Sequence, residues 1–179
     1  GLLQLDMGMS NKNENDKTAA LARFEAVKKI NPNFPRIYYF IAKTHFELGL
    51  YEQALDIVKI EKQKNPSLAD PYILTAQIYM MKEKYVECAE EYQLAIKLRP
   101  VAENYVNAAI CYRKANMLDL AEEMLGYTVD IKDGKPRLKE GSDASVFREY
   151  GYIYELRGNT YEAKRNFKIY LELTAYNSV

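Results

Sequence analysis

Hydrophobic residues recur along this chain with the spacing of an α-helix rather than the alternation of a β-strand. In four segments an aromatic residue is followed by three further packing residues at offsets of three, four and seven positions. These sets are Tyr38, Ile41, Ala42 and His45; Tyr72, Thr75, Ala76 and Tyr79; Tyr105, Ala108, Ala109 and Tyr112; and Phe147, Tyr150, Gly151 and Tyr154. Positions with this spacing form one stripe along a helix, so each segment predicts an amphipathic helix.

A second pattern follows each stripe and also precedes the first one. A small residue is followed four positions later by a large one, which places both on the same helix face. The pairs are Ala20 and Phe24, Ala54 and Val58, Cys88 and Tyr92, Ala121 and Leu125, and Ala163 and Phe167. A short turn such as Leu48-Gly49-Leu50-Tyr51 separates the two patterns, so each unit is expected to be helix, turn, helix.

Prolines set the length of the unit. Pro32, Pro66 and Pro100 are 34 residues apart, and each follows an amphipathic run. Proline cannot continue a helix, so each one is expected to end a helix and reset the chain. The sequence therefore predicts an all-α fold with a period of about 34 residues.

Together these features resemble the tetratricopeptide repeat family, which combines the aromatic stripe, the small-to-large pair and the closing proline on this period. The resemblance implies an α-solenoid of stacked helix-turn-helix repeats with a right-handed superhelical twist. We expect a single array over 1–179, and its first repeat has an incomplete stripe, so that its first helix should be short or frayed. The expected repeats are roughly 1–34 (degenerate), 35–68, 69–101, 102–133 and 144–177.

About nine extra residues separate the last two repeats, and we expect an insertion loop over 132–143. Because surface connections tolerate added length, this should be a solvated loop, or an extra helical turn followed by a loop. Its cationic residues offer an alternative, a contact for an acidic partner. They are Lys132, Lys135, Arg137 and Lys139.

Charge limits the classes of partner. The chain has 25 Lys and Arg residues against 25 Asp and Glu residues, which argues against bulk binding to nucleic acid or to an anionic membrane. A related helical-repeat array that reads single-stranded RNA is a weaker alternative for the same reason. No apolar run approaches the ~20 residues of a membrane span. The compartment is not fixed by the sequence, with the cytoplasm slightly favoured, and the chain begins as if cut from a longer protein.

Catalytic chemistry is not indicated. The only histidine, His45, occupies the stripe position held by tyrosine in the other three sets, so we expect a partly buried packing residue with a hydrogen-bond partner. Cys88 and Cys111 lack metal-ligand spacing and are expected to be small buried residues. No phosphate-binding glycine loop or nucleophile motif accompanies them. We therefore expect no enzyme activity, no metal and no cofactor.

The resemblance implies that the first helix of each repeat lines a concave groove with the residues outside its packing stripe. An apolar strip that includes Leu74 should run along the middle, with polar groups at its rim, as in a peptide groove. The candidate binding residues are Tyr39, Lys43, Phe46, Ile73, Gln77, Met80, Asn107, Ile110, Arg113, Arg148 and Tyr152. Asn107 matches an Asn that contacts the ligand backbone in peptide-binding members of the family. The cationic clamp of the chaperone-tail binders is absent.

We therefore expect a non-catalytic adaptor that holds a peptide segment or a partner helix of another protein in this groove. The alternative is a structural scaffold that self-associates through an end face, since a terminal repeat needs a polar outer face and none clearly follows Leu173.

Overall fold

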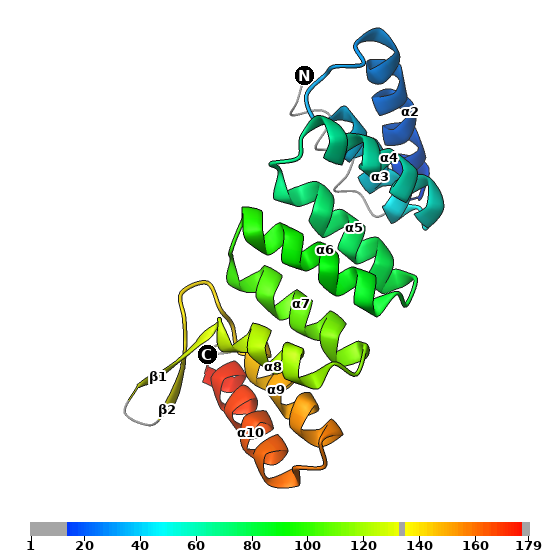
Figure 1. Ribbon diagram of the computed structural model, residues 1–179. Coiled ribbons are helices and arrows are strands. Elements are labelled where there is room, and N and C mark those ends of the chain that lie inside the picture. The colour runs from blue at the N-terminus through cyan, green and yellow to red at the C-terminus, as the bar shows by residue number, and fades with distance from the viewer. Residues whose placement is uncertain (1–13, 133–134, 177–179) are drawn as a thin grey trace. The chain divides into compact units, whose positions relative to one another are not determined.

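The computed structural model describes residues 14–132 and 135–176 and shows antiparallel helices joined by short turns (Figure 1). The chain forms two compact units and passes from the first to the second between Lys82 and Glu83. The predicted first helix of the degenerate first repeat lies outside the described residues. The all-α fold of stacked helix pairs is confirmed within them, with one small sheet added.

The described part of the first unit contains four helices. They are α2 (Glu14–Ile30), α3 (Ile37–Glu47), α4 (Tyr51–Lys64) and α5 (Ala69–Met81). Each helix packs against the next, and α3 also contacts α5. One buried cluster joins Ala20 and Phe24 of α2 to Ile37 and Ile41 of α3. The small-to-large pair of one helix therefore packs on the aromatic stripe of the next, as its spacing predicts.

The second unit contains five described helices and a β-hairpin. They are α6 (Tyr85–Leu98), α7 (Ala102–Lys114), α8 (Leu118–Gly126), β1 (Val129–Lys132), β2 (Lys135–Leu138), α9 (Ser145–Leu156) and α10 (Thr160–Tyr176). Consecutive helices pack together, and α7 also contacts α9. The small residues Cys88, Ala121 and Ala163 are buried, so close helix packing follows the predicted pairs here too.

Prolines and turns divide the helices where the sequence predicts. Helices α2, α4 and α6 end two residues before Pro32, Pro66 and Pro100 respectively. Within each repeat the first helix ends in a tight turn closed by backbone hydrogen bonds. In the α3–α4 turn the Leu50 N–H donates to the His45 carbonyl at 2.9 Å, and the Asn159 N–H donates to the Tyr154 carbonyl at the same distance in the α9–α10 turn.

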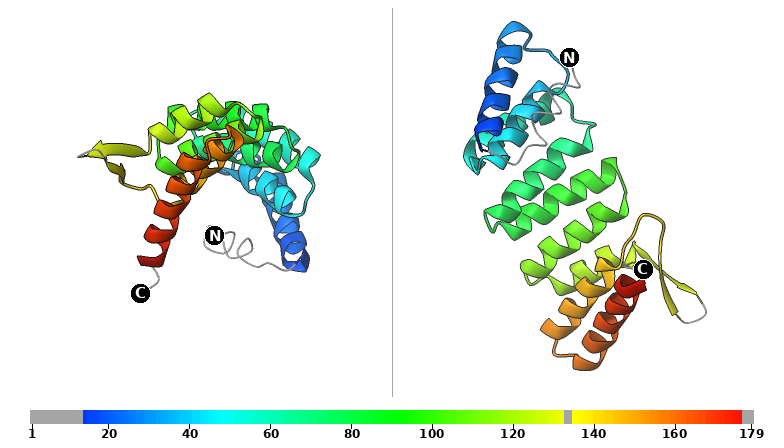
Figure 2. Two further views of the ribbon diagram at one scale, coloured as in Figure 1. Left: turned by 90° about the horizontal axis from the view of Figure 1, so that it is seen from below. Right: turned by 180° about the vertical axis from the view of Figure 1, so that it is seen from behind.

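The connection between α8 and α9 differs from the expected loop over 132–143. Its first part is the antiparallel hairpin β1–β2, in which Val129 pairs with Leu138 and Lys132 with Lys135 (Figure 1). Figure 2 shows this hairpin projecting away from the helices of its unit. The hairpin alternates apolar and polar residues on both strands, a strand pattern that helical periodicity does not reveal. The prediction of an irregular loop or an extra helical turn was wrong for this part.

Candidate functional site

A hollow of about 200 Å³ lies between α7 and α9, which are the first helices of successive repeats in the second unit. Helix α7 contributes Val106, Asn107 and Ile110, and α9 contributes Ser145 and Arg148. The loop Gly141–Asp143, which enters α9, closes one side. Three predicted binding residues, Asn107, Ile110 and Arg148, are therefore brought together. The cavity combines aliphatic groups with an amide, hydroxyls, one guanidinium and the carboxylates of Glu103 and Asp143, a mixture suited to a peptide backbone and its side chains.

Two arginines beside this cavity share one carboxylate. The Arg113 Nε donates to Glu149 Oε2 at 2.9 Å, and the Arg148 Nε and Nη2 donate to Glu149 Oε1 at 3.2 Å. The Glu149 side chain is only 3% exposed, whereas both guanidiniums reach the surface more. Two positive charges against one negative charge leave this three-residue cluster with one excess positive charge, while Glu103 and Asp143 place two negative charges on the lining of the adjoining cavity.

The guanidinium groups of Arg113 and Arg148 each lie over an aromatic ring. Arg113 lies 4.9 Å from the ring centroid of Tyr152, and Arg148 lies 5.8 Å from that of Tyr170. Burial acts to lower the pKa of Arg148, but the charge and hydrogen bond of Glu149 and the hydrogen bond of Tyr170 outweigh it and raise the pKa above its usual value. The planar arginines are thus fixed in orientation before any ligand arrives, which lowers the entropic cost of binding.

Comparison with known proteins identifies the repeat. A family model described as the tetratricopeptide repeat matches residues 35–59, which span α3 and most of α4. The crystal structure of MamA superposes with a TM-score of 0.78 at 24% identity, covering 96% of each chain. The chain therefore carries the tetratricopeptide repeat over residues 35–59 and has the fold of solved proteins built from such repeats.

Other solved tetratricopeptide repeat proteins share the fold. TTC0263 of Thermus thermophilus superposes with a TM-score of 0.65 at 21% identity, over 94% of this chain and 89% of that one. YrrB, described as having an unusual peptide-binding site, superposes with a TM-score of 0.71 at 16% identity, over 89% of this chain and 78% of that one. No curated protein sequence matches the chain. The fold is that of a protein–protein interaction module.

The first unit of the tetratricopeptide array carries the other predicted binding residues on α3 and α5. They are Tyr39, Lys43, Phe46, Ile73, Gln77 and Met80. Gln77 is exposed and the other five are half-buried. Tyr39 and Phe46 also pack against the core cluster around Ala42 and Val58, so part of each ring belongs to the core. Leu74, predicted to be in the apolar strip, is 2% exposed and is a core residue, so that assignment was wrong.

The loop Gly141–Asp143 lines the cavity, and Glu149 binds the two arginines beside it; sequence reasoning assigned neither to the site. The helical spacing of the sequence does not predict the burial of Glu149 beneath two arginines. One signal in the sequence was available. Arg148 and Glu149 are adjacent in a helix that also carries the packing stripe, and a buried acid requires a cationic partner.

The histidine and the two cysteines of the array are partly or fully buried. His45 is half-buried, and burial lowers its pKa, with the nearby Glu25 acting in the opposite direction. Its Nδ1 has no hydrogen-bond partner within the described ranges, so the partner predicted from the sequence is not found at that atom. Cys88 of α6 and Cys111 of α7 are buried as predicted, but they form a disulfide rather than two separate thiols.

The described part of the array offers neither a cluster of metal ligands nor a helix that could cross a membrane. It contains no group of three or more His, Cys, Asp or Glu side chains that could hold a metal ion. None of its helices has the length and apolar character needed to cross a bilayer.

Proposed function

We propose that the chain is an adaptor that binds a peptide segment of a partner protein in the groove between α7 and α9. Asn107 is proposed to exchange hydrogen bonds with the peptide backbone, because an amide offers both a donor and an acceptor. Ile110 and Tyr152 supply apolar contact area beside it. The observation that carries the proposal is the cavity in which Asn107 and Arg148 meet.

The peptide is proposed to present an acidic side chain to Arg148. Arg148 lines the cavity, and Glu149 neutralises only one of the two arginines that it binds. Because Glu103 and Asp143 also line the cavity, the proposal places the ligand carboxylate beside Arg148 and away from these two acids. A ligand carboxylate placed near Arg148 would satisfy the remaining charge through the charge-assisted hydrogen bonds that guanidinium groups favour. In the first unit, Tyr39, Lys43, Phe46, Ile73, Gln77 and Met80 are proposed to contact the same class of ligand through α3 and α5.

The test uses peptides selected against the purified chain from a random 12-residue displayed library, with binding then measured by fluorescence anisotropy. We expect selected peptides to be enriched in Asp or Glu. The double variant Asn107→Ala/Arg148→Ala should weaken their binding about tenfold or more, the effect of removing a few hot-spot contacts. Far-UV circular dichroism should stay unchanged, because both residues are only partly buried.

Lys97→Ala on α6 is the matched control, since Lys97 is exposed and does not line the cavity. It removes one positive charge from the same unit and should leave peptide affinity within twofold. Selected peptides that bind the double variant as tightly as the unmodified chain would show that the groove is not the binding site.

A further inference from the structure

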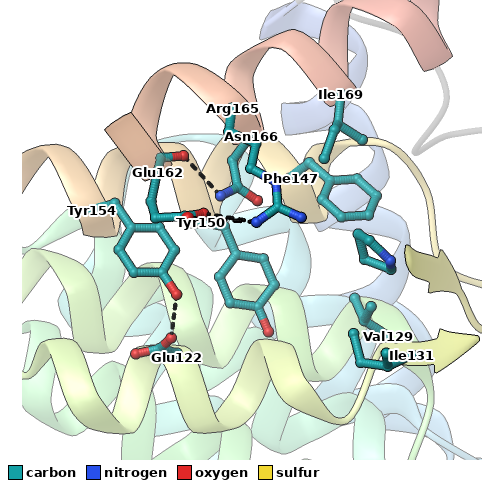
Figure 3. A pocket seen from close by; sticks show the side chains of 11 residues that line it. Glu122, Val129, Ile131, Phe147, Tyr150, Tyr154, Glu162, Arg165, Asn166 and Ile169 are labelled. Carbon is teal, nitrogen blue, oxygen red and sulfur yellow. Dashed lines mark hydrogen bonds and ion pairs between the residues drawn. The ribbon is translucent and has the colours of Figure 1, made fainter. Parts of the chain in front are cut away.

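A second cavity lies elsewhere in the second unit and is not used by the proposed groove. It has a volume of about 240 Å³ and is bounded by α8, the hairpin, α9 and α10 (Figure 3). Val129, Ile131 and Pro136 of the hairpin form one wall, and Phe147 and Ile169 lie among the helical residues that form the others. No residue lines both cavities.

This cavity arises where the second helix of one repeat is short. Helix α8 has nine residues, whereas α4 and α6 have 14 each. Five missing residues correspond to ~7.5 Å of helix, about one and a half turns. The chain turns into β1 at that point instead, and its hairpin leaves open the space beside α9 and α10.

The hairpin has one apolar face and one basic face. Opposed residues in the register are Ile131 with Pro136 and Lys132 with Lys135, and successive residues along a strand point to opposite faces. Val129, Ile131 and Pro136 therefore share the face that lines the cavity. Lys132, Lys135 and Arg137 share the other face together with Asp130, and all four are exposed. Asp130 is paired with the nearby Lys139 at 3.5 Å, so the basic character of that face remains.

One edge of the hairpin is equipped for strand pairing. The Lys139 N–H donates to the Thr128 carbonyl at 3.0 Å, which makes that pair hydrogen-bonded. Hydrogen-bonded and non-hydrogen-bonded pairs alternate in an antiparallel ladder, so the backbone N–H and C=O groups of Val129 and Ile131 point outward from β1. On β2 the corresponding position is Pro136, which has no N–H to donate. The β1 edge is therefore the better template for an added strand.

The charged groups at the rim of the cavity are already paired with each other. Glu122 accepts a hydrogen bond from the Tyr154 hydroxyl at 2.7 Å, and Arg165 contacts Glu162 at 3.3 Å (Figure 3). Glu122 also forms an ion pair with Arg157. Recognition of a ligand charge therefore falls to the exposed basic face of the hairpin. Ile131 is 72% exposed although its side chain borders the cavity, which leaves apolar area for a ligand to cover.

We propose that this hairpin is a second docking site, independent of the groove, that adds an extended acidic peptide of a partner protein to the outer edge of β1. An added strand has the same alternation as the strand that it joins. Its residues on the cavity side should be aliphatic and cover Val129 and Ile131. Its alternate residues should be Glu or Asp, beside Lys132 of β1 and on the same face as Lys135 and Arg137 of β2.

The probe is a fluorescein-labelled peptide in which Glu and Val alternate over eight residues. Its control has the same composition but places four Val residues before four Glu residues. We expect saturable binding of the alternating peptide and at least about tenfold weaker binding of the block peptide, because only the former can present one apolar and one acidic face. Binding should weaken as salt is raised, since the basic face is exposed.

Two variants separate backbone pairing from charge. Ile131→Pro removes one outward N–H without breaking the hairpin, as Pro136 opposite it already demonstrates, and should weaken binding about tenfold. Ile131→Val keeps the N–H and is its control. Lys135→Glu/Arg137→Glu should also weaken binding about tenfold, against a Lys97→Glu control on α6.

The binding measurements would either support or overturn the hairpin site. Loss of binding in Ile131→Pro and in the charge-reversal variant, with binding retained in Arg148→Ala, would support a hairpin site separate from the groove. Equal binding of the alternating and block peptides would overturn it. So would self-association of the chain that Ile131→Pro abolishes and that neither peptide displaces, because the occupant would then be a second copy.

Discussion

Four residues in left-handed backbone conformation occupy the same place in successive repeats. Gly49, Glu83, Asn116 and Gly158 have φ angles of 75°, 57°, 59° and 75°, and each lies in the turn between the paired helices. Glycine adopts this conformation readily and asparagine tolerates it, but a glutamate there carries a steric cost of about 1 kcal/mol. Glu83 is therefore the position at which the repeat pattern and the local residue disagree.

Glu83→Gly should stabilise the protein by about 0.5–1 kcal/mol, because removing Cβ relieves the left-handed strain. Urea unfolding followed by circular dichroism measures the change. Ala115→Gly is the control, since Ala115 holds the preceding place in its own turn with a φ of −77° and gains nothing from glycine. That variant should lose stability, and a loss in Glu83→Gly as well would argue against the strained turn.

Single residues also mark the limit of sequence reasoning. The stripes and small-to-large pairs could be predicted because helical spacing fixes which side chains share a face, and Ile41, Ala76 and Ala108 are fully buried as that spacing requires. The pairing of Arg113 with Glu149 could not, because the hairpin insertion separates the two residues by a distance that no regular period predicts. The disulfide was not predicted because two cysteines are too few to indicate a disulfide framework, so both were expected to be small buried residues.

At the scale of elements, α9 and α10 are in unusually close contact. A Cβ atom built at Gly151 would lie 2.4 Å from the nearest atom of the Phe167 ring. Phe167 is itself packed edge-on against Tyr152, at 5.3 Å between ring centroids. The ring therefore has little freedom to move away, and Gly151 sets how closely these two helices approach.

Gly151→Ala should destabilise the protein by about 1–3 kcal/mol, the usual cost of overpacking. Adding Phe167→Leu should recover part of that loss, since the smaller side chain makes room, and thermal or urea unfolding of the four members of this mutant cycle measures the coupling. Gly126→Ala at the end of α8 is the control, because nothing lies within 4 Å of the added Cβ. Additive effects of the two substitutions would exclude the proposed clash.

The sequence pattern did not predict the hairpin. Val129 to Lys132 and Lys135 to Leu138 are strands of four residues each, too short for alternation to be distinguished from a loop. The 34-residue period indicated only that extra residues were present. Val129 and Ile131 line a cavity together with residues of α9 and α10, a tertiary arrangement that no local pattern contains.

The molecule as a whole has balanced charge, but its positive charge is unevenly distributed. Equal numbers of cationic and anionic residues leave no long-range field of one sign, while Arg113 with Arg148 and the hairpin concentrate positive charge locally. Such patches suit short acidic peptides better than a polyanion, whose binding requires many phosphate contacts in a row.

We therefore expect no detectable binding of a labelled 20-nucleotide single-stranded RNA at 150 mM salt, measured by anisotropy up to about 50 µM protein. The alternating peptide described above serves as the positive control under the same conditions. Tight RNA binding with a steep salt dependence would instead favour a nucleic-acid-binding array.

The shortened α8 shows how a modular architecture can acquire a new surface at low risk. Each module is held mainly by its immediate neighbours, so a change confined to one outer helix disturbs little of the remaining packing. A hairpin in place of the last part of a helix could thus arise, vary and be tuned by selection while the opposing pair α7 and α9 kept its own geometry. Proteins of this kind could diversify their contacts by editing a single module rather than by lengthening the array.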